Sequence, residues 1–157
     1  MTRGDLVLVD TNVYLCATDR SRSEHRDSWD FLRKCAGAGV HCAVTGQILR
    51  EYLVVATRPP AVNGLGLHPE DALANVRTFR SRAVFLDENE AVSRQLAALI
   101  RRSSIVGKKI HDANIAAVLA VYRVPYLVTA NKNDFAFVEH AHLMTPGEAL
   151  ASLPGGE

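Results

Sequence analysis

Four acidic side chains, spread along the chain, are the residues of this sequence that could do chemistry together: Asp10, Glu51, Asp112 and Asp134. Carboxylates gathered in a partly dry cleft repel one another strongly unless cations neutralise them. A cluster of oxygen ligands without His or Cys suits Mg²⁺ or Mn²⁺, which activate water and stabilise the charge that develops on a phosphodiester. If the fold brings the acids together, they indicate metal-dependent phosphoryl transfer, for which nucleases are the commonest example.

Asp10 stands directly after a short apolar run, Leu6–Val9. An unbroken apolar run of this length predicts a strand buried on both faces, as in a parallel sheet covered by helices. Ligands of such sheets collect outside the carboxyl ends of the strands. An Asp before a helical pattern is also an ordinary N-cap. Asp10 therefore has two interpretations, as a helix cap and as a site residue.

Asp112 opens the segment HDANIAAVLAVYR, which is apolar nearly all round and predicts a buried helix. The unpaired N–H groups and the macrodipole at a helix start favour an ionised carboxylate. Small neighbours such as Ala113 and Ala116 let this helix pack close to the sheet. Glu51 lies in another helix, TGQILREYLVVAT, within reach of the same sheet edge. The competing interpretations are a capping Asp112 and a solvated Glu51.

Strands and helices alternate along the whole chain. Beyond the first strand, residues 40–44, 83–87 and 124–129 predict three more, and the segment HLMTPGEAL predicts a last strand and a terminal helix. This alternation is typical of the α/β class, here a three-layer α/β/α sandwich with a mainly parallel central sheet. A length of 157 residues predicts a single domain over residues 1–157.

Two helices have boundary signals of their own. The segment SEHRDSWDFLRKCAGAG predicts a helix with Ser23 as its N-cap and with Trp29, Leu32 and Ala36 on one face. Pro69, followed by two acidic residues, predicts the start of a helix that runs to about Ser81.

The composition, 48% hydrophobic and 22% charged residues, is that of a globular protein and excludes a disordered chain. A net charge of +1 gives no global argument for nucleic-acid binding. Three cysteines without CxxC spacing indicate small buried residues in a reducing compartment, not a disulfide set or a zinc site. No apolar run reaches about 18 residues and no signal-peptide pattern opens the chain, so we expect a cytoplasmic protein without a membrane partner.

Four segments in order, VLVDTNVYL, ILREYLVVATRP, KKIHDANIAAV and YLVTANKNDF, resemble the PIN-domain family, specifically the VapC-type toxins of type II toxin–antitoxin systems. A DTN after a strand is weak alone, but the four segments together are specific and cover nearly the whole chain. The resemblance implies an endoribonuclease that uses Mg²⁺ or Mn²⁺ to hydrolyse RNA by in-line attack of a metal-activated water. It also implies a cognate antitoxin protein and a homodimer, for which residues 13–18 and 49–55 offer apolar surface.

Carried over from the family, Asp10 and Asp112 are the principal metal ligands, and Glu51 is the acid of the second motif, which binds metal directly or through water. His111 is expected to be a structural or surface residue rather than a general base, because metal-bound hydroxide already fills that role.

The fourth motif departs from the family. Many members carry an acid where this chain has Asn131, and Asp134 is expected to supply the catalytic charge instead. Hydrogen bonds that orient the acids or the phosphate are expected from Thr11, Asn12, Thr129 and Asn131. Several basic residues either contact phosphate or are solvated surface charges: Arg20, Arg22, Lys108, Lys109 and Lys132.

Two other functions compete with the ribonuclease. Asn131 leaves open a catalytically inactive PIN fold that serves as an RNA-binding or assembly module. A phosphatase with Asp10 as nucleophile would require a second acid in a DxD motif after the strand, and the DTN of this chain lacks it.

Overall fold

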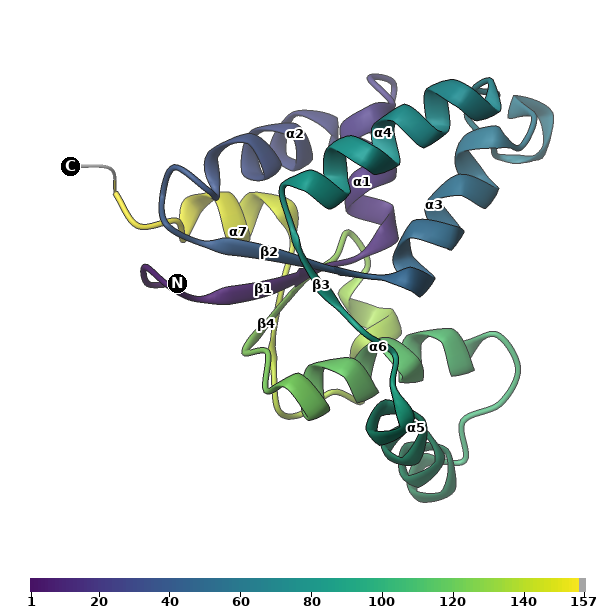
Figure 1. The fold of residues 1–157 in the computed structure, drawn as a ribbon, viewed down its shortest axis with the longest axis vertical. Coiled ribbons are helices and arrows are strands. Elements are labelled where there is room, and N and C mark those ends of the chain that lie inside the picture. The colour runs from purple at the N-terminus through teal and green to yellow at the C-terminus, as the bar shows by residue number, and fades with distance from the viewer. Residues whose placement is uncertain (156–157) are drawn as a thin grey trace.

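The computed structural model describes residues 1–155 and has a five-stranded central sheet (Figure 1). Its strands, in the spatial order β3-β2-β1-β4-β5, are β1 (Leu6–Val9), β2 (His41–Thr45), β3 (Val84–Leu86), β4 (Tyr126–Val128) and β5 (His142–Met144). Every neighbouring pair is parallel. The predicted α/β class with a mainly parallel sheet is confirmed. The last two residues of the predicted domain, 156 and 157, lie outside the described residues.

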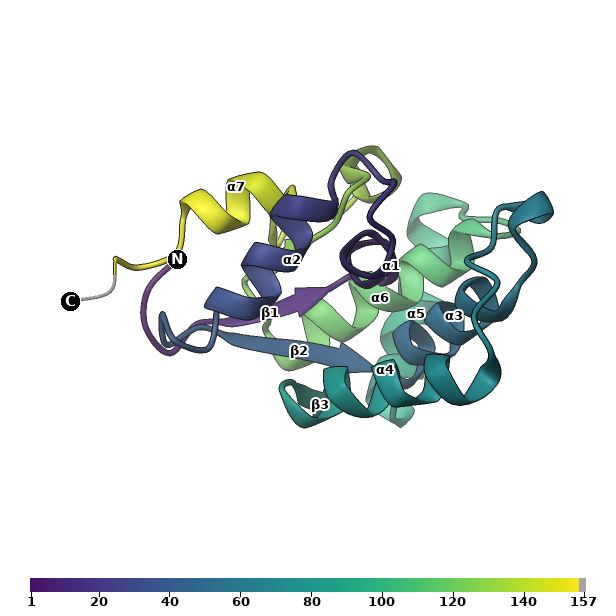
Figure 2. The same cartoon turned by 90° about the horizontal axis from the view of Figure 1, so that it is seen from above.

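Helices cover both faces of the sheet, as Figures 1 and 2 show. One face carries α5 (Glu90–Ser103) packed against α6 (Lys109–Tyr122), and the other carries α1 (Thr11–Thr18), α2 (His25–Lys34), α4 (Pro69–Ser81) and α7 (Pro146–Ala151). The helix α3 (Gly46–Thr57) follows β2 and contacts α1 and α4, and two short 3-10 helices are η1 (Pro60–Val62) and η2 (Lys132–Phe135). None of the helices within residues 1–155 has the length and apolar character needed to span a bilayer.

The first strand forms the centre of the core because both of its faces are covered. Val7, Leu8 and Val9 are fully buried, as the unbroken apolar run predicts. The helix α6 packs with small residues: Ala113, Ala116 and Ala117 are buried. Burying one large aliphatic side chain contributes about 1.5–3 kcal/mol, so the buried residues of β1 stabilise the strand that carries Asp10 at its end.

The strand order creates a topological switch point between β1 and β4. The chain leaves β1 toward β2 on one side, and β4 pairs with β1 on the other side. The connecting helices lie on opposite faces of the sheet, so a crevice forms where the two strands end, and ligands of open α/β sheets bind in such crevices. Asp10 directly follows β1, and Thr129 directly follows β4, at this position.

One local prediction about α2 needs correction. Ser23 is not the N-cap: the cap position is Glu24, without a side-chain hydrogen bond to the helix, and the Ser23 hydroxyl bonds to the Glu24 carboxylate instead. The helix buries Ser28 and Phe31, whereas Trp29, on the predicted face with Leu32 and Ala36, is 55% exposed. The prediction for α4 is confirmed, since it begins at Pro69 and ends at Ser81.

Candidate active site

Asp10 is both a helix cap and a residue of the switch-point crevice. Its Oδ1 accepts a hydrogen bond from the Thr11 backbone N–H at 2.7 Å, and its Oδ2 accepts one from the Thr129 hydroxyl at 2.8 Å. The residue is only 7% exposed. The two interpretations of Asp10 are therefore compatible: one oxygen caps α1, while the hydroxyl at the end of β4 holds the other.

Asn12 and Thr129 join the end of β1 to the end of β4. The Asn12 side chain donates from Nδ2 to the Thr129 hydroxyl at 3.0 Å and accepts at Oδ1 from the Ala130 backbone N–H at 2.9 Å. The backbone N–H of Asn131 also donates to the Thr129 hydroxyl, at 3.1 Å. Thr129 is fully buried, so this network holds the Asp10 carboxylate in one orientation.

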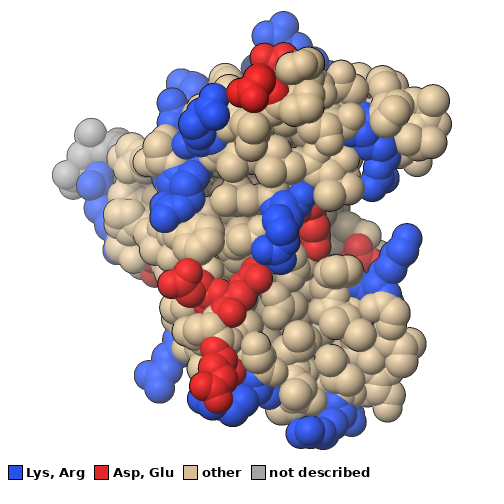
Figure 3. All heavy atoms as spheres, turned by 45° about the vertical axis from the view of Figure 1, so that its right-hand side comes forward, with Lys and Arg blue, Asp and Glu red and all other residues tan. Residues whose placement is uncertain are grey.

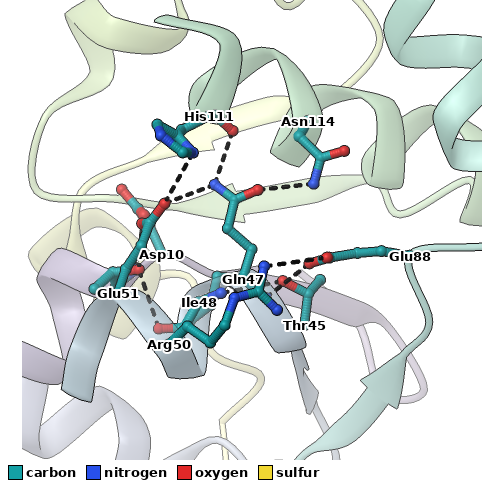
Figure 4. Close-up of polar contacts among 10 residues, drawn as sticks. Asp10, Thr45, Gln47, Ile48, Arg50, Glu51, Glu88, His111 and Asn114 are labelled. Atoms are coloured by element: carbon teal, nitrogen blue, oxygen red, sulfur yellow. Dashed lines mark hydrogen bonds and ion pairs between the residues drawn. The ribbon is translucent and has the colours of Figure 1, made fainter. Parts of the chain in front are cut away.

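Glu51 points from α3 toward the same edge instead of into solvent. The Thr11 hydroxyl donates to its Oε2 at 3.1 Å, and the Gln47 side chain donates to its Oε1 at 2.8 Å. The Nδ1 atom of His111 lies 3.7 Å from the same Oε1 (Figure 4). Glu51 is therefore linked to the residue that follows Asp10.

Gln47, which the sequence reasoning missed, connects α3 to α6. Its side chain is 4% exposed, donates to the His111 carbonyl oxygen at 2.9 Å, and accepts from the Asn114 amide at 2.7 Å (Figure 4). A neutral amide carries no chemical signal by itself. Its spacing is the one feature of the sequence that could have indicated this role. Residues four apart on a helix share a face, and Gln47 lies four residues before Glu51.

Glu88, also missed, follows β3 at the same edge of the sheet. Its Oε1 accepts from the Gln47 backbone N–H at 2.8 Å, which satisfies one of the unpaired donors at the start of α3. Its Oε2 lies 3.7 Å from a guanidinium nitrogen of Arg50. The rule that singled out Asp10, an acid just after a strand, also applies to this residue.

Asp112 lies in the first turn of α6 but does not cap it. The helix begins at Lys109, with Lys108 at the N-cap position, so the capping interpretation is wrong. Gly107, whose φ of 62° favours glycine, turns the chain just before this point and allows the helix to begin early.

The acids influence one another through their charges. Burial raises the pKa of Asp10 from 3.8 to about 6; hydrogen bonds from Thr129 and Thr11 oppose this rise, and the charges of Glu51 and Asp112 add to it. Burial, followed by the charges of Asp134 and Glu51, raises the pKa of Asp112 from 3.8 to about 6. All four predicted acids thus belong to one electrostatic cluster.

Hard oxygen donors under mutual repulsion have the chemistry that suits a divalent cation such as Mg²⁺ or Mn²⁺. Within residues 1–155, however, no three Asp, Glu, His or Cys side chains converge closely enough to hold an ion in their present arrangement. Both Glu51 oxygens already accept hydrogen bonds, from Thr11 and Gln47. The donor types fit the ion, and ligation requires the carboxylates to draw closer together.

Asn131 has a definite contact in this cluster. Its amide donates to Asp134 Oδ2 at 2.6 Å. Asp134 is close enough to Asp112 for its charge to raise the pKa of that residue. The amide at the position where many family members have an acid therefore holds the acid three residues later.

Two of the five basic residues considered as phosphate contacts are engaged in ion pairs. The Lys132 ammonium contacts the Glu148 carboxylate at 2.9 Å, and the Arg22 guanidinium contacts Asp19 at 3.2 Å. Lys109, by contrast, lies close enough to Asp112 to lower its pKa. Figure 3 shows acidic groups across the middle of the visible face, with Lys and Arg on both sides.

A cavity of about 1030 Å³ lies away from the acids. It opens between α1, α2 and α4 above β2, and its lining includes the Trp29, Leu32 and Ala36 face of α2. None of the four predicted acids lines it. We call it the α1–α2–α4 cavity.

This chain is similar to known VapC proteins in sequence and in fold. No model of a known protein family matches the chain. Over 131 residues the chain is 32% identical to Ribonuclease VapC24 of Mycobacterium tuberculosis, which covers 83% of this chain and 89% of that protein.

Solved structures share the fold. VapBC2 from Rickettsia felis, bound to a promoter DNA fragment, aligns with a TM-score of 0.64 at 17% identity, over 89% of this chain and 98% of that one. VapC20 of Mycobacterium tuberculosis, a toxin that cleaves the Sarcin-Ricin loop, aligns with a TM-score of 0.64 at 13% identity. The alignment covers 83% of this chain and 94% of that one.

Proposed function

The chain belongs to the VapC family of PIN-domain proteins, and from this premise we propose that it is the ribonuclease toxin of a toxin–antitoxin pair. The observation that carries the proposal is the buried Asp10 carboxylate at the switch point, in electrostatic contact with Glu51 and Asp112. A relative at 32% identity that bears the name ribonuclease supports the same reaction class. The inactive-fold alternative is not favoured, because Asp134 retains a charge beside Asp112.

Asp10, Asp112 and Glu51 would hold a Mg²⁺ or Mn²⁺ ion, with Asp134 as the fourth acid. When bound, the ion supplies an activated water and stabilises negative charge on the phosphate. The protein's contribution is orientation: Thr129 and the Thr11 N–H hold the two oxygens of Asp10. A pKa of about 6 leaves Asp10 mostly ionised at neutral pH, which is the form that binds a cation.

Gln47 holds the opposite side of the site. Its amide donates to Glu51 Oε1 within α3 and to the His111 carbonyl oxygen of α6, and its own oxygen accepts from the Asn114 amide of α6. Glu51 is thereby held beside the helix that carries Asp112. Productive geometry in such a site depends on hydrogen bonds of this kind around the ligands.

RNA is the proposed substrate, and Lys109 is the cation best placed to contact its phosphates, since it lies next to Asp112. Phosphate contacts make binding weaken as salt concentration rises. Lys132 and Arg22 are already paired with acids and are weaker candidates.

The proposed partners are a cognate antitoxin protein and a second copy of the chain. The Rickettsia felis and Salmonella typhimurium relatives are VapBC proteins, which supports the antitoxin. For the homodimer, residues 13–18 do not offer the expected apolar surface, because Val13 to Ala17 are buried inside the subunit. On α3, Val54 is 55% exposed, so its side chain could contact a second subunit.

The deciding experiment measures cleavage of total RNA with Mn²⁺ by the wild-type protein and by Asp10→Asn and Asp112→Asn. We expect each variant to lose more than about 100-fold in rate, the upper end of what groups supporting a metal site contribute. The matched control is Asp5→Asn, which changes an acid at the other end of β1 and is expected to leave the rate unchanged. Wild-type rates in a folded Asp10→Asn protein would refute the proposal, and RNA binding without any Mn²⁺-dependent cleavage would favour the inactive module.

A further inference from the structure

Two cysteines form a close pair under α2, outside the cluster of acids. Cys35 follows the last residue of α2, and Cys42 is the second residue of β2. Their sulfur atoms are 3.1 Å apart, and both residues are buried. The side chains already point at each other, which is the geometric requirement for a disulfide bond.

Cys35 and Cys42 are both among the residues that line the α1–α2–α4 cavity, so a small molecule that enters it comes next to them. Three arginines, Arg20, Arg33 and Arg82, line the same cavity. A cavity with cationic walls concentrates anionic molecules. Cys16, the remaining cysteine, lies in α1 and is not among the lining residues.

The two thiols are chemically unequal. The hydrogen bond from Cys42 is the largest cause that lowers the pKa of Cys35, and the charge of Arg82 lowers it further. The same hydrogen bond, together with burial, raises the pKa of Cys42 well above its usual value. Cys35 is therefore the sulfur that attacks, because the thiolate is the nucleophile in disulfide exchange.

We propose that Cys35 and Cys42 are a redox-reactive dithiol, which an anionic low-molecular-weight disulfide entering the α1–α2–α4 cavity oxidises to an intramolecular disulfide. The inference is independent of the ribonuclease proposal.

The exchange proceeds in two displacements. The Cys35 thiolate attacks one sulfur of the disulfide R–S–S–R, which forms a mixed disulfide and releases RS⁻. Cys42 then loses its proton to the released thiolate, and its sulfur attacks Cys35 Sγ and expels the second RS⁻, which takes up a proton from solvent. Two electrons pass from the protein thiols to R–S–S–R, and the products are the protein disulfide and two molecules of RSH.

The disulfide would tie the end of α2 to β2 beneath the cavity. Only a short approach of the two sulfurs is needed, since a disulfide bond length is about 2.05 Å. The cross-link closes a short chain segment, which raises stability by restricting the unfolded chain.

The test treats folded wild-type protein with oxidised glutathione, stops the exchange with a thiol quencher, denatures the protein and then counts its free thiols. We expect the number of free thiols to fall from three to one. The protein should carry no added glutathione mass, and a peptide map should show Cys35 linked to Cys42. In Cys16→Ser the count should fall from two to none. In Cys42→Ser, a glutathione adduct should persist on Cys35, because nothing resolves it.

Probe charge supplies a second readout. Oxidised glutathione is anionic and should react faster than neutral hydroxyethyl disulfide, which should react faster than cationic cystamine. Equal rates for the three probes would overturn the role given to the cavity. Three thiols retained in the folded wild type, or a stable glutathione adduct with Cys42 still free, would overturn the dithiol itself.

Discussion

The burial of the Asp10 carboxylate costs folding free energy when the group is ionised. The folded protein binds the proton of Asp10 more tightly than the unfolded chain does, because the pKa rises from 3.8 to about 6. The associated stability is fully present below pH 3.8 and is lost as the pH rises through about 6. The ionised carboxylate therefore destabilises the folded protein as long as nothing neutralises its charge.

A pH series of Asp10→Asn tests this cost. In metal-free buffer, the free energy of unfolding of the variant relative to the wild type should rise between pH 4 and pH 7. The rise should approach about 3 kcal/mol, the equivalent of the pKa shift. Urea unfolding at each pH measures it. A difference between the two proteins that stays constant with pH would contradict the buried, strained carboxylate.

Gln47 is the second residue whose contribution can be measured. Gln47→Leu keeps the size but leaves the Asn114 amide and the His111 carbonyl oxygen without this partner. We expect a loss of about 1–3 kcal/mol in unfolding free energy and a fall of about 10–100-fold in RNA cleavage. Gln95→Leu, on the partly exposed surface of α5, is the matched control. Full activity of folded Gln47→Leu would remove Gln47 from the site.

At the scale of elements, the site depends on the junction between β1 and β4. Thr129 receives hydrogen bonds from Asn12 and Asn131 and donates its own to Asp10. No segment of the chain alone positions Asp10, because its carboxylate accepts hydrogen bonds from Thr11 at the start of α1 and from Thr129 after β4. The junction is rigid because its central hydroxyl is fully buried.

Thr129→Val is the substitution that opens this junction while keeping the side-chain shape. It leaves Asp10 Oδ2 and the Asn12 amide without their partner, and the unfolding free energy should fall by about 1–3 kcal/mol. The pKa of Asp10 should rise further, because a bond that lowers it is lost. Thr129→Ser keeps the hydroxyl and should restore the wild-type pH profile of cleavage. Identical profiles for the Val and Ser variants would contradict this role.

At the scale of the whole molecule, the proposed cation binding would be linked to folding. Four carboxylates that repel one another in the folded state would be relieved by an ion that the unfolded chain binds poorly. We therefore expect the repulsion to lower the stability of the metal-free protein and to raise the affinity of the site for a cation.

Melting curves with and without Mn²⁺ measure this linkage. At neutral pH, an ion at 100 times its dissociation constant should stabilise the protein by about 2.7 kcal/mol. The gain should shrink at pH 5, where Asp10 and Asp112 take up protons, since both have a pKa of about 6. Asp112→Asn should lose most of the gain at neutral pH, whereas Asp5→Asn should keep it. An equal shift for all three proteins would point to ions bound elsewhere.

The sequence by itself determined the class of the fold and the identity of the acids. A buried apolar strand followed by Asp10, and an apolar helix with Asp112 in its first turn, are local patterns that depend on nearest neighbours alone. The alternation of these patterns predicts a parallel sheet, and parallel strands place their carboxyl ends at one edge. Acids far apart in the chain are therefore assigned to the same edge of the sheet by local patterns alone.

Only the tertiary structure decided the strand order and the groups that hold the acids. Gln47 reaches Asn114 across 67 positions and Asn12 reaches Thr129 across 117, and these contacts exist only because α3 lies beside α6 and β1 beside β4. Neutral amides and hydroxyls carry no distinctive local pattern, so their roles follow from packing. The proximity of Cys35 to Cys42 has the same origin. Local preferences define elements, whereas long-range packing decides which side chains meet.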